Sequence, residues 1–300
     1  MFTLPFDKMP YLQAIPLSNA AVNQNITLSL SVLRLDVIHN QISGNKWFKL
    51  QLYLNEALQQ KCSRIVTFGG AYSNHIVATA VACQLAGISC MGVIRGDVQT
   101  NPTLTIAVAA GMQLQFIDRT HYKNKKIVQQ QLQQPGDYWI NEGGYGRLGA
   151  EGAMNIHQYI LPSTTHIIAA VGTGTMMAGL IQAALPHQNM IGIPVLKGAD
   201  MIQQDIEYLV NDSKKMKQMT WISACHFGGY AKHNAILLQK MNEWWQLYQL
   251  PTDKVYTAKL IWAVFDLVEK KYFPAGSKIV AIHSGGLQGN ASLLPHILKF

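Results

Sequence analysis

RIVTFGGAYSNHIVATAVACQL, residues 64–85, is the stretch that decides the fold class of this 300-residue chain. Residues 64–68 are typical of a buried strand, because they are rich in apolar and β-branched side chains. After a short turn that contains two glycines, residues 74–85 form an apolar segment long enough for a helix. A buried strand followed by a helix is half of a β–α–β unit, and such units build parallel sheets.

Further strands and helices alternate along the rest of the chain. The sequence predicts strands at residues 89–94, 113–117, 138–140, 166–171, 190–195 and 278–283. It predicts helices at residues 103–110, 121–133, 176–184 and 257–271. Uninterrupted apolar runs, such as residues 167–171, are typical of strands that are covered on both faces. We therefore expect an α/β protein with open, mainly parallel, twisted sheets and helices on both faces.

A glycine-rich stretch, EGGYGRLG at residues 142–149, separates two runs of this alternation. A chain of 300 residues also exceeds the usual size of a single core. We interpret the stretch as the crossing between two lobes. Residues 49–149 would form a smaller α/β lobe, inserted into a larger lobe that consists of residues 1–48 and 150–300.

The charge of the chain bears on its ligands. The formal net charge is +8, from 24 Lys and Arg against 16 Asp and Glu. The basic residues are scattered, and the densest cluster, residues 123–126, is short. Nucleic-acid binding usually needs a concentrated basic face, whereas an anionic small ligand explains a positive bias equally well. We expect a small-molecule ligand and keep nucleic acid as an alternative that a salt-dependent binding assay would test.

The cysteine spacing and the first residues of the sequence bear on whether this is a metal-binding, disulfide-rich, secreted or membrane protein. The four cysteines form no CxxC pair, so the sequence predicts neither a metal site nor a disulfide framework. The first residues lack the basic region and apolar core of a signal peptide. Residues 166–185 are apolar enough to suggest a membrane span, but a Gly-Thr-Gly-Thr turn interrupts them. We expect a cytoplasmic protein that is not inserted in a membrane.

A lysine, Lys46, follows Gly44-Asn45 at the point where an extended segment gives way to an apolar helix. An amine that is held at a helix start and stripped of water can act as a nucleophile or form a Schiff base with a carbonyl. The alternative is an ordinary surface lysine after a turn. Three glycine-containing turns downstream favour the chemical role.

The first of these turns precedes the helix predicted at residue 74. Its two glycines let the backbone approach a ligand closely, and the helix start offers unpaired N–H groups to an anion. Ser73 and Asn74 add a hydroxyl and an amide at the same place. The alternative is a helix cap without a ligand, since Ser and Asn are common capping residues.

The second turn has N–H groups and hydroxyls that could bind a phosphate; it consists of Gly172, Thr173, Gly174 and Thr175. A P-loop is excluded because no Gly-Lys-Ser/Thr follows at the required spacing. A dinucleotide site is disfavoured because the glycine spacing differs and no acidic residue ends the next strand. A cradle for one phosphate monoester remains, with a plain tight turn as the alternative. In the third turn, Ser284 follows the last strand, at the edge where open α/β sheets bind ligands.

A lysine at a helix start, a phosphate-binding turn and a hydroxyl at a strand end together describe a pyridoxal phosphate site. The lysine would hold the aldehyde, the turn the phosphate, and the hydroxyl would face the pyridine nitrogen. From about residue 43 to 290, the chain resembles the 1-aminocyclopropane-1-carboxylate deaminase/D-cysteine desulfhydrase family of fold-type II pyridoxal phosphate enzymes. The resemblance implies a cofactor in the cleft between two lobes, a small amino-acid substrate and a homodimer.

The resemblance also implies roles for single residues. Gly44-Asn45-Lys46 followed by Lys49-Leu50 is similar to the family's lysine motif, which makes Lys46 the Schiff-base lysine and Lys49 a second lysine without a covalent bond. By the same likeness Asn74 would bond the phenolic oxygen of the cofactor. Ser73 would contact the substrate carboxylate.

Tyr230 and Tyr256 resemble the family's two active-site tyrosines, which would position the substrate or transfer protons. The deaminase branch carries Glu after the second tyrosine and Leu in the last glycine-rich segment, whereas this chain has Thr257 and Ser284. Small hydroxyls at both places resemble the desulfhydrase branch. A neutral partner leaves the pyridine ring a weaker electron sink, which suffices to eliminate a thiolate but is less suited to opening a cyclopropane.

The sequence therefore predicts a pyridoxal-phosphate-dependent β-eliminating lyase that converts D-cysteine to pyruvate, ammonia and hydrogen sulfide. The amine of Lys46 would remove the α proton. Two alternatives remain open. One is 1-aminocyclopropane-1-carboxylate deaminase, and the other is a catalytically silent binding protein that keeps the fold.

Overall fold

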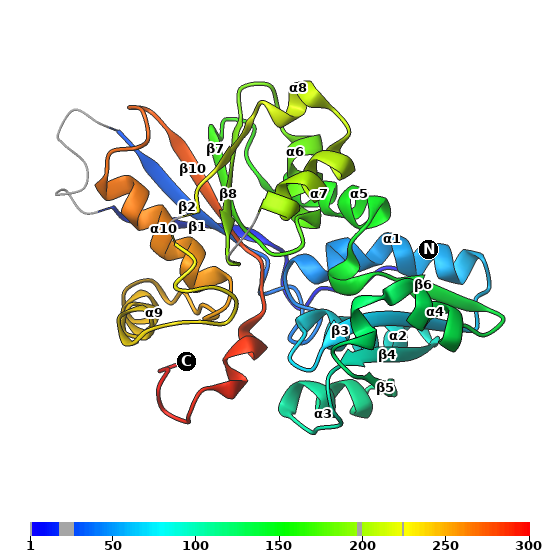
Figure 1. Ribbon diagram of the computed structural model, residues 1–300. Coiled ribbons are helices and arrows are strands. Elements are labelled where there is room, and N and C mark those ends of the chain that lie inside the picture. Colours follow the sequence, from blue (N-terminus) through cyan, green and yellow to red (C-terminus); the bar gives the residue numbers. More distant parts are fainter. Residues whose placement is uncertain (1, 18–26, 197–199, 224) are drawn as a thin grey trace.

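The computed structural model describes residues 2–17, 27–196, 200–223 and 225–300, and its strands form two sheets (Figure 1). The larger sheet contains β1 (Tyr11–Ile15), β2 (Ser29–Arg34), β7 (His166–Val171), β8 (Asn189–Pro194), β9 (Met219–Trp221) and β10 (Lys278–His283). Their order is β1-β2-β10-β7-β8-β9, and of the paired neighbours only β1 and β2 are antiparallel.

The smaller sheet is parallel throughout. It contains β3 (Arg64–Gly70), β4 (Ser89–Arg95), β5 (Gln113–Ile117) and β6 (Asp137–Ile140), in the order β5-β4-β3-β6. All four strands stand in the chain between β2 and β7, which belong to the larger sheet. This arrangement is consistent with a smaller lobe inserted into a larger one, although the boundaries at residues 48–49 and 149–150 stay predictions.

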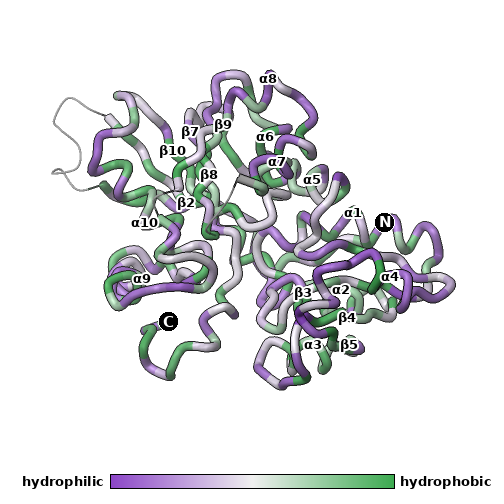
Figure 2. The backbone as a smooth tube through the Cα atoms, in the orientation of Figure 1, coloured by the Kyte–Doolittle hydropathy of each residue, from purple (hydrophilic) through white to green (hydrophobic). Residues whose placement is uncertain are grey.

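Helices flank both sheets (Figure 1). They are α1 (Asn45–Gln59), α2 (Asn74–Ala86), α3 (Pro102–Ala109), α4 (Lys125–Leu132), α5 (Arg147–Met154), α6 (Thr175–Ala183), α7 (Asp200–Val210), α8 (Ser213–Met216), α9 (Ala235–Tyr248) and α10 (Thr257–Glu269). Figure 2 shows hydrophobic residues along β8, a strand of the larger sheet, whereas the region around α8 is mainly hydrophilic. Among the described helices, none is both long and apolar enough to cross a membrane.

Alternation along β7 explains why helices cover both faces of the larger sheet. Ile167 and Ala169 belong to the core that contains α6 and α7 side chains, whereas Ile168 and Ala170 belong to the core formed with α9 and α10. Successive side chains of a strand point to opposite faces, so an apolar strand buried on both faces needs a helix layer on each side.

One hydrophobic core connects the two sheets. It includes Leu33 and Ile282 from the larger sheet and Ile65 and Ile94 from the smaller one, all of them buried. Side chains from α1, α2, α5 and α6 fill the space between them. The carboxyl ends of strands from both sheets are therefore held against a common set of helices, and the loops that follow them meet.

The fold-class prediction is confirmed. Strands 113–117, 166–171 and 278–283 have the predicted bounds, and residues 166–185 form a strand, a turn and a helix instead of a membrane span. The helix predicted at residues 121–133 is wrong as a single element. A 3₁₀ turn, His121–Lys123, precedes α4, and the Asn124 side chain accepts a hydrogen bond from the Ile127 N–H and caps that helix.

Candidate active site

A cavity of about 960 Å³ lies where the loops after β3, β7 and β10 meet the start of α1. Ligands of open parallel sheets bind outside the carboxyl ends of the strands, so both sheets contribute to one site. Most of the predicted site residues line this cavity, namely Lys46, Ser73, Asn74, Gly172, Thr173, Gly174, Tyr230, Tyr256 and Ser284. Among the described residues, no three His, Cys, Asp or Glu side chains are grouped to hold a metal ion.

The backbone around Gly44 fixes Lys46 at the cavity. Gly44 has a φ of 65° and a ψ of −139°, a conformation that is open to glycine and rare for other residues. A Cβ at this position would lie only 1.9 Å from the carbonyl oxygen of Ser284. The N–H of Asn45 donates to that same oxygen at 3.2 Å. The turn at residues 44–46, which we call the lysine turn, therefore packs closely against the loop that follows β10.

The amine of Lys46 lies in an environment that favours its neutral form. Burial lowers the pKa of Lys46 to about 8, although the charge of Asp253 acts in the opposite direction. Its Nζ donates a hydrogen bond to Oδ1 of Asn45 at 2.7 Å. A lysine with a pKa near 8 is partly deprotonated at neutral pH, which a nucleophile or a general base requires.

Sequence analysis missed Asp253, whose charge acts on Lys46. Its carboxylate is buried at the start of α10 and accepts hydrogen bonds from the N–H groups of Val255 and Tyr256 and from the N–H and hydroxyl of Thr257. These donors and the helix start stabilise a negative charge near Lys46. A Thr-Asp pair before an apolar helix indicates a helix start, but the sequence gives no sign of its proximity to the lysine.

The turn after β7 combines hydroxyls, a helix start and a second lysine. Gly174, with a φ of 76°, is the N-cap of α6, and as a glycine it offers no side chain to cap this helix start. The Nζ of Lys49 donates to Oγ1 of Thr173 at 3.3 Å. Burial lowers the pKa of Lys49 well below its ordinary value, and the charge of Lys46 adds to this effect. A dianion in this turn would favour the charged form of Lys49 and gain a strong hydrogen bond.

His75 lies next to Lys49 and is neutral. Burial lowers its pKa well below the ordinary value, with contributions from the charges of Lys49 and Lys46. The hydroxyl of Thr67 donates to the carbonyl of Ile140 at 2.9 Å and lies 2.8 Å from Nε2 of His75. From this geometry we assign the proton of the ring to Nε2, which leaves the buried Nδ1 as an acceptor without a partner among the described residues.

The start of α2 fits a ligand better than a simple cap. Ser73 is the N-cap residue, yet its side chain makes no capping hydrogen bond, in contrast to Asn101 and Asn234, which cap their helices. The buried Oδ1 of Asn74 has no hydrogen-bond partner among the described residues. A buried polar atom without a partner is costly, so a bound group is expected to satisfy it.

Two tyrosines face each other at the cavity. The rings of Tyr230 and Tyr256 are 6.2 Å apart and inclined by 73°. Burial raises the pKa of Tyr256 well above its ordinary value, with further contributions from Tyr230 and Asp253. At neutral pH its hydroxyl is therefore a hydrogen-bond donor. The buried amine of Lys259, on α10, donates to the carbonyls of residues 226 and 229 and holds the loop that carries Tyr230.

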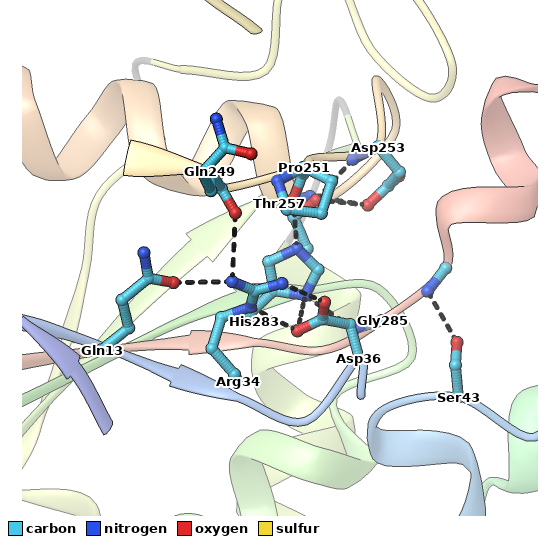
Figure 3. A network of polar contacts seen from close by, with 11 residues as sticks. Gln13, Arg34, Asp36, Ser43, Gln249, Pro251, Asp253, Thr257, His283 and Gly285 are labelled. Atoms are coloured by element: carbon cyan, nitrogen blue, oxygen red, sulfur yellow. Dashed lines mark hydrogen bonds and ion pairs between the residues drawn. The ribbon is translucent and has the colours of Figure 1, made fainter. Parts of the chain in front are cut away.

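A buried polar network supports the carboxyl ends of β2 and β10 (Figure 3). Arg34 makes two hydrogen bonds to the carboxylate of Asp36, at 2.8 and 2.7 Å, and His283 lies 3.1 Å from that carboxylate. Burial raises the pKa of Asp36, but His283 and Arg34 together bring it below its ordinary value. Ser43 accepts a hydrogen bond from the N–H of Gly286 at 3.2 Å. The network fixes the two loops that position Lys46.

Two predicted cofactor contacts do not reach the cavity. Thr257 is buried and does not line it, because its hydroxyl donates to the carboxylate of Asp253 and accepts from the Asp253 N–H. Thr175 is also buried away from the cavity, with its hydroxyl 3.2 Å from that of Thr173. Of the two hydroxyls considered for the pyridine nitrogen, Ser284 is the one at the cavity.

These features fit pyridoxal phosphate. Lys46 would supply the amine for the aldehyde, and the helix start with Thr173 and Lys49 would supply donors for the phosphate. The Oδ1 of Asn74, which has no partner among the described residues, would be available to the cofactor. A profile of the family described as "Pyridoxal-phosphate dependent enzyme" matches residues 29–285. The chain belongs to this family and is a pyridoxal-phosphate-dependent enzyme.

Curated relatives are similar over most of their length. A candidate 1-aminocyclopropane-1-carboxylate deaminase of Pyrococcus abyssi is 25% identical over 291 residues, covering 89% of this chain and 87% of that protein. The D-cysteine desulfhydrase of Yersinia enterocolitica is 25% identical over 282 residues, covering 85% and 86%. The crystal structure of a 1-aminocyclopropane-1-carboxylate deaminase homologue superposes with a TM-score of 0.78 at 22% identity, covering 95% and 92% of the two chains.

The lowered pKa of Lys46 predicts a pH dependence of cofactor binding. Since only the neutral amine attacks an aldehyde, the rate at which apoprotein takes up pyridoxal phosphate should rise with pH and level off above about 8. Borohydride trapping followed by mass spectrometry of the peptide that contains Lys46 would measure this rate. A midpoint near the ordinary lysine pKa of about 10.4 would contradict the placement of this amine.

Removal of the second lysine should weaken phosphate binding selectively. A charge-assisted hydrogen bond contributes roughly 1.5–3 kcal/mol, so Lys49→Gln should raise the dissociation constant of pyridoxal phosphate about 10- to 100-fold. Pyridoxal, which lacks the phosphate, is the matched ligand, and its affinity should change little. If both ligands lose affinity equally, Lys49 supports the fold of the site and does not bind the phosphate.

Proposed function

We propose that this enzyme is a β-eliminating lyase for a small amino acid such as D-cysteine, with pyruvate, ammonia and hydrogen sulfide as products. The observation that carries the proposal is the neutral hydroxyl of Ser284 in the cavity wall, beside the turn that holds Lys46. Glu142 is the only carboxylate among the described residues of that wall, and it is paired with Lys125 at 2.6 Å.

When bound, the cofactor withdraws electrons from the α-carbon of the substrate and makes its proton more acidic. A pyridine ring without a carboxylate partner does this less strongly, so a substrate with a good leaving group on its β-carbon is favoured. Asp253 is close to this region, but its oxygens are occupied by four donors at the start of α10. This arrangement supports elimination of a thiolate over opening of a cyclopropane.

Residues of the chain would carry out proton abstraction and substrate binding. The amine of Lys46, with its lowered pKa, takes the α proton, and a positioned general base contributes roughly 10²- to 10⁴-fold to the rate. The free hydroxyl of Ser73 and the start of α2 bind the carboxylate of the substrate. Tyr256 donates a hydrogen bond to the bound substrate, because its hydroxyl stays protonated.

A substrate panel tests the proposal. We expect the purified holoenzyme to form keto acid and sulfide from D-cysteine and to leave 1-aminocyclopropane-1-carboxylate unchanged. D- and L-amino acids with and without a leaving group on the β-carbon complete the panel. Keto acid from the cyclopropane substrate without sulfide from D-cysteine would contradict the proposal and identify a deaminase.

A deaminase is the second candidate, because relatives with that name match most of the chain. The family resemblance also suggests a cytoplasmic homodimer, which light scattering of the holoenzyme would test. A monomeric mass would contradict this expectation.

A further inference from the structure

Four cationic side chains line the cavity in addition to Lys46 and Lys49, more than are needed to bind the carboxylate of an amino acid. Arg95, Arg119, Lys123 and Lys125 line the cavity on the side of the smaller sheet. Glu142 pairs with Lys125 at 2.6 Å. For the other three cations, no ion pair with a described residue offsets the charge. These residues lie apart from the lysines at the start of α1, which serve the cofactor.

A buried tyrosine lies at the centre of this cluster. Only 3% of Tyr122 is exposed, and its hydroxyl has no hydrogen-bond partner among the described residues, although it lines the cavity. The guanidinium carbon of Arg95 lies 5.8 Å from the centre of its ring, and Nζ of Lys125 lies 5.5 Å away. Burial and the charge of Glu142 raise the pKa of Tyr122, so its hydroxyl is a donor. The guanidinium of Arg95 and the phenol of Tyr122 are donors that are suited to an anion.

Arg95 is close to the turn that precedes Ser73. It is the last residue of β4, and its Nη2 would lie 3.6 Å from a Cβ at Gly70, the last residue of β3. Burial raises the pKa of Tyr230, which comes from the opposite side of the cavity, and the charge of Arg95 opposes part of this shift. An anion bound by Arg95 would therefore lie beside a substrate whose carboxylate is held at the start of α2.

We propose that the natural substrate of this enzyme carries a second anionic group on its side chain, and that Arg95 and Tyr122 bind that group. Arg119 and Lys123, which are exposed, attract it electrostatically. The cavity of about 960 Å³ lies near the upper end of the range of roughly 300–1,000 Å³ for small-molecule sites, which leaves room for the longer side chain. The proposal rests on the lyase function and narrows its substrate class.

Equilibrium binding to the holoenzyme tests this proposal independently of turnover. Aspartate and 2-amino-3-phosphonopropanoate, which carry no leaving group on the β-carbon, are compared as both enantiomers with asparagine and alanine by the absorbance change of the bound cofactor. We expect at least one acidic ligand to bind 10-fold or more tightly than its neutral counterpart. Aspartate and 2-amino-3-phosphonopropanoate distinguish a carboxylate from a phosphate-like group as the preferred anion. Equal affinities for acidic and neutral ligands would overturn the proposal.

Substitutions then assign the preference to Arg95. Arg95→Gln should remove the difference between acidic and neutral ligands while affinity for asparagine and alanine stays within about two-fold. Arg147→Gln is the matched control, because Arg147 is exposed and does not line the cavity. Equal losses for acidic and neutral ligands in Arg95→Gln would place Arg95 at the α-carboxylate and refute the assignment. If D-cysteine is not converted but the binding preference is found, the proposed reaction fails and the anion site stands.

Discussion

Lys46→Ala should yield a folded protein that lacks the absorbance of the covalently held cofactor and has lost at least about 10³-fold of its keto-acid formation. The substitution removes both the atom that bonds the aldehyde carbon and the base that takes the α proton. The bound cofactor should absorb at about 410–430 nm in the unaltered protein. Absorbance spectra and turnover with the preferred substrate measure the two losses.

Two control variants are needed. One tests whether the amine of Lys46 or only its positive charge is required, and the other tests whether replacing any lysine has the same effect. Lys46→Arg keeps a positive charge but cannot form the bond, so it should lose the same absorbance band. Lys240→Ala changes a half-exposed lysine outside the cavity, paired with Glu243, and should keep both properties. A coloured, active Lys46→Ala protein would show that another amine holds the cofactor. An unaltered protein that stays colourless with added cofactor would favour a silent binding protein.

Gly44→Ala should cost roughly 3 kcal/mol or more of folding free energy and abolish cofactor binding. The conformation of Gly44 is strained for alanine, and the new methyl group would lie 1.9 Å from the carbonyl oxygen of Ser284. Because that atom belongs to the backbone, relief requires the lysine turn and the loop after β10 to separate. Thermal unfolding and cofactor absorbance measure the two effects.

Gly87→Ala provides the matched control for this substitution. Gly87 ends α2 with a φ of 67°, close to the value of 65° at Gly44, but nothing lies within 4 Å of the Cβ that alanine would add. We expect a loss of roughly 1 kcal/mol from the left-handed backbone and full cofactor binding. Similar losses in both variants would mean that backbone strain alone determines the result and that contact with Ser284 is unimportant.

Sequence periodicity determined most of the elements between residues 64 and 195. Apolar strands such as β7 are recognised because burial on both faces leaves no polar positions. The helix predicted at residues 121–133 failed because Asn124, a capping residue, starts a new helix within an otherwise continuous pattern. β1 and β2 were missed because polar residues interrupt both strands, and because β10, which joins β2 to the rest of the sheet, lies far away in the chain.

The sequence pointed to the lysine and the turns of the candidate site because each of them is recognisable from a few consecutive residues. A glycine before a lysine, a Gly-Thr-Gly-Thr turn and a serine at a strand end are all patterns within a few residues. The same reasoning could have found Arg95, since it directly follows the strand predicted at residues 89–94, at the edge where ligands bind. Asp253 was not, because its effect on Lys46 depends on a distance between segments about 200 residues apart.

The sequence by itself determined the alternating α/β plan and the cofactor, and it predicted Lys46 as the lysine that would hold this cofactor. The tertiary structure decided which of the two candidate hydroxyls reaches the cavity: Ser284 does, whereas Thr257 is turned to Asp253. It also brought Arg95 and Tyr122 together at the cavity wall on the side of the smaller sheet. Burial and charge act through space between segments remote in the chain, so pKa values and substrate contacts follow from packing, which no local pattern records.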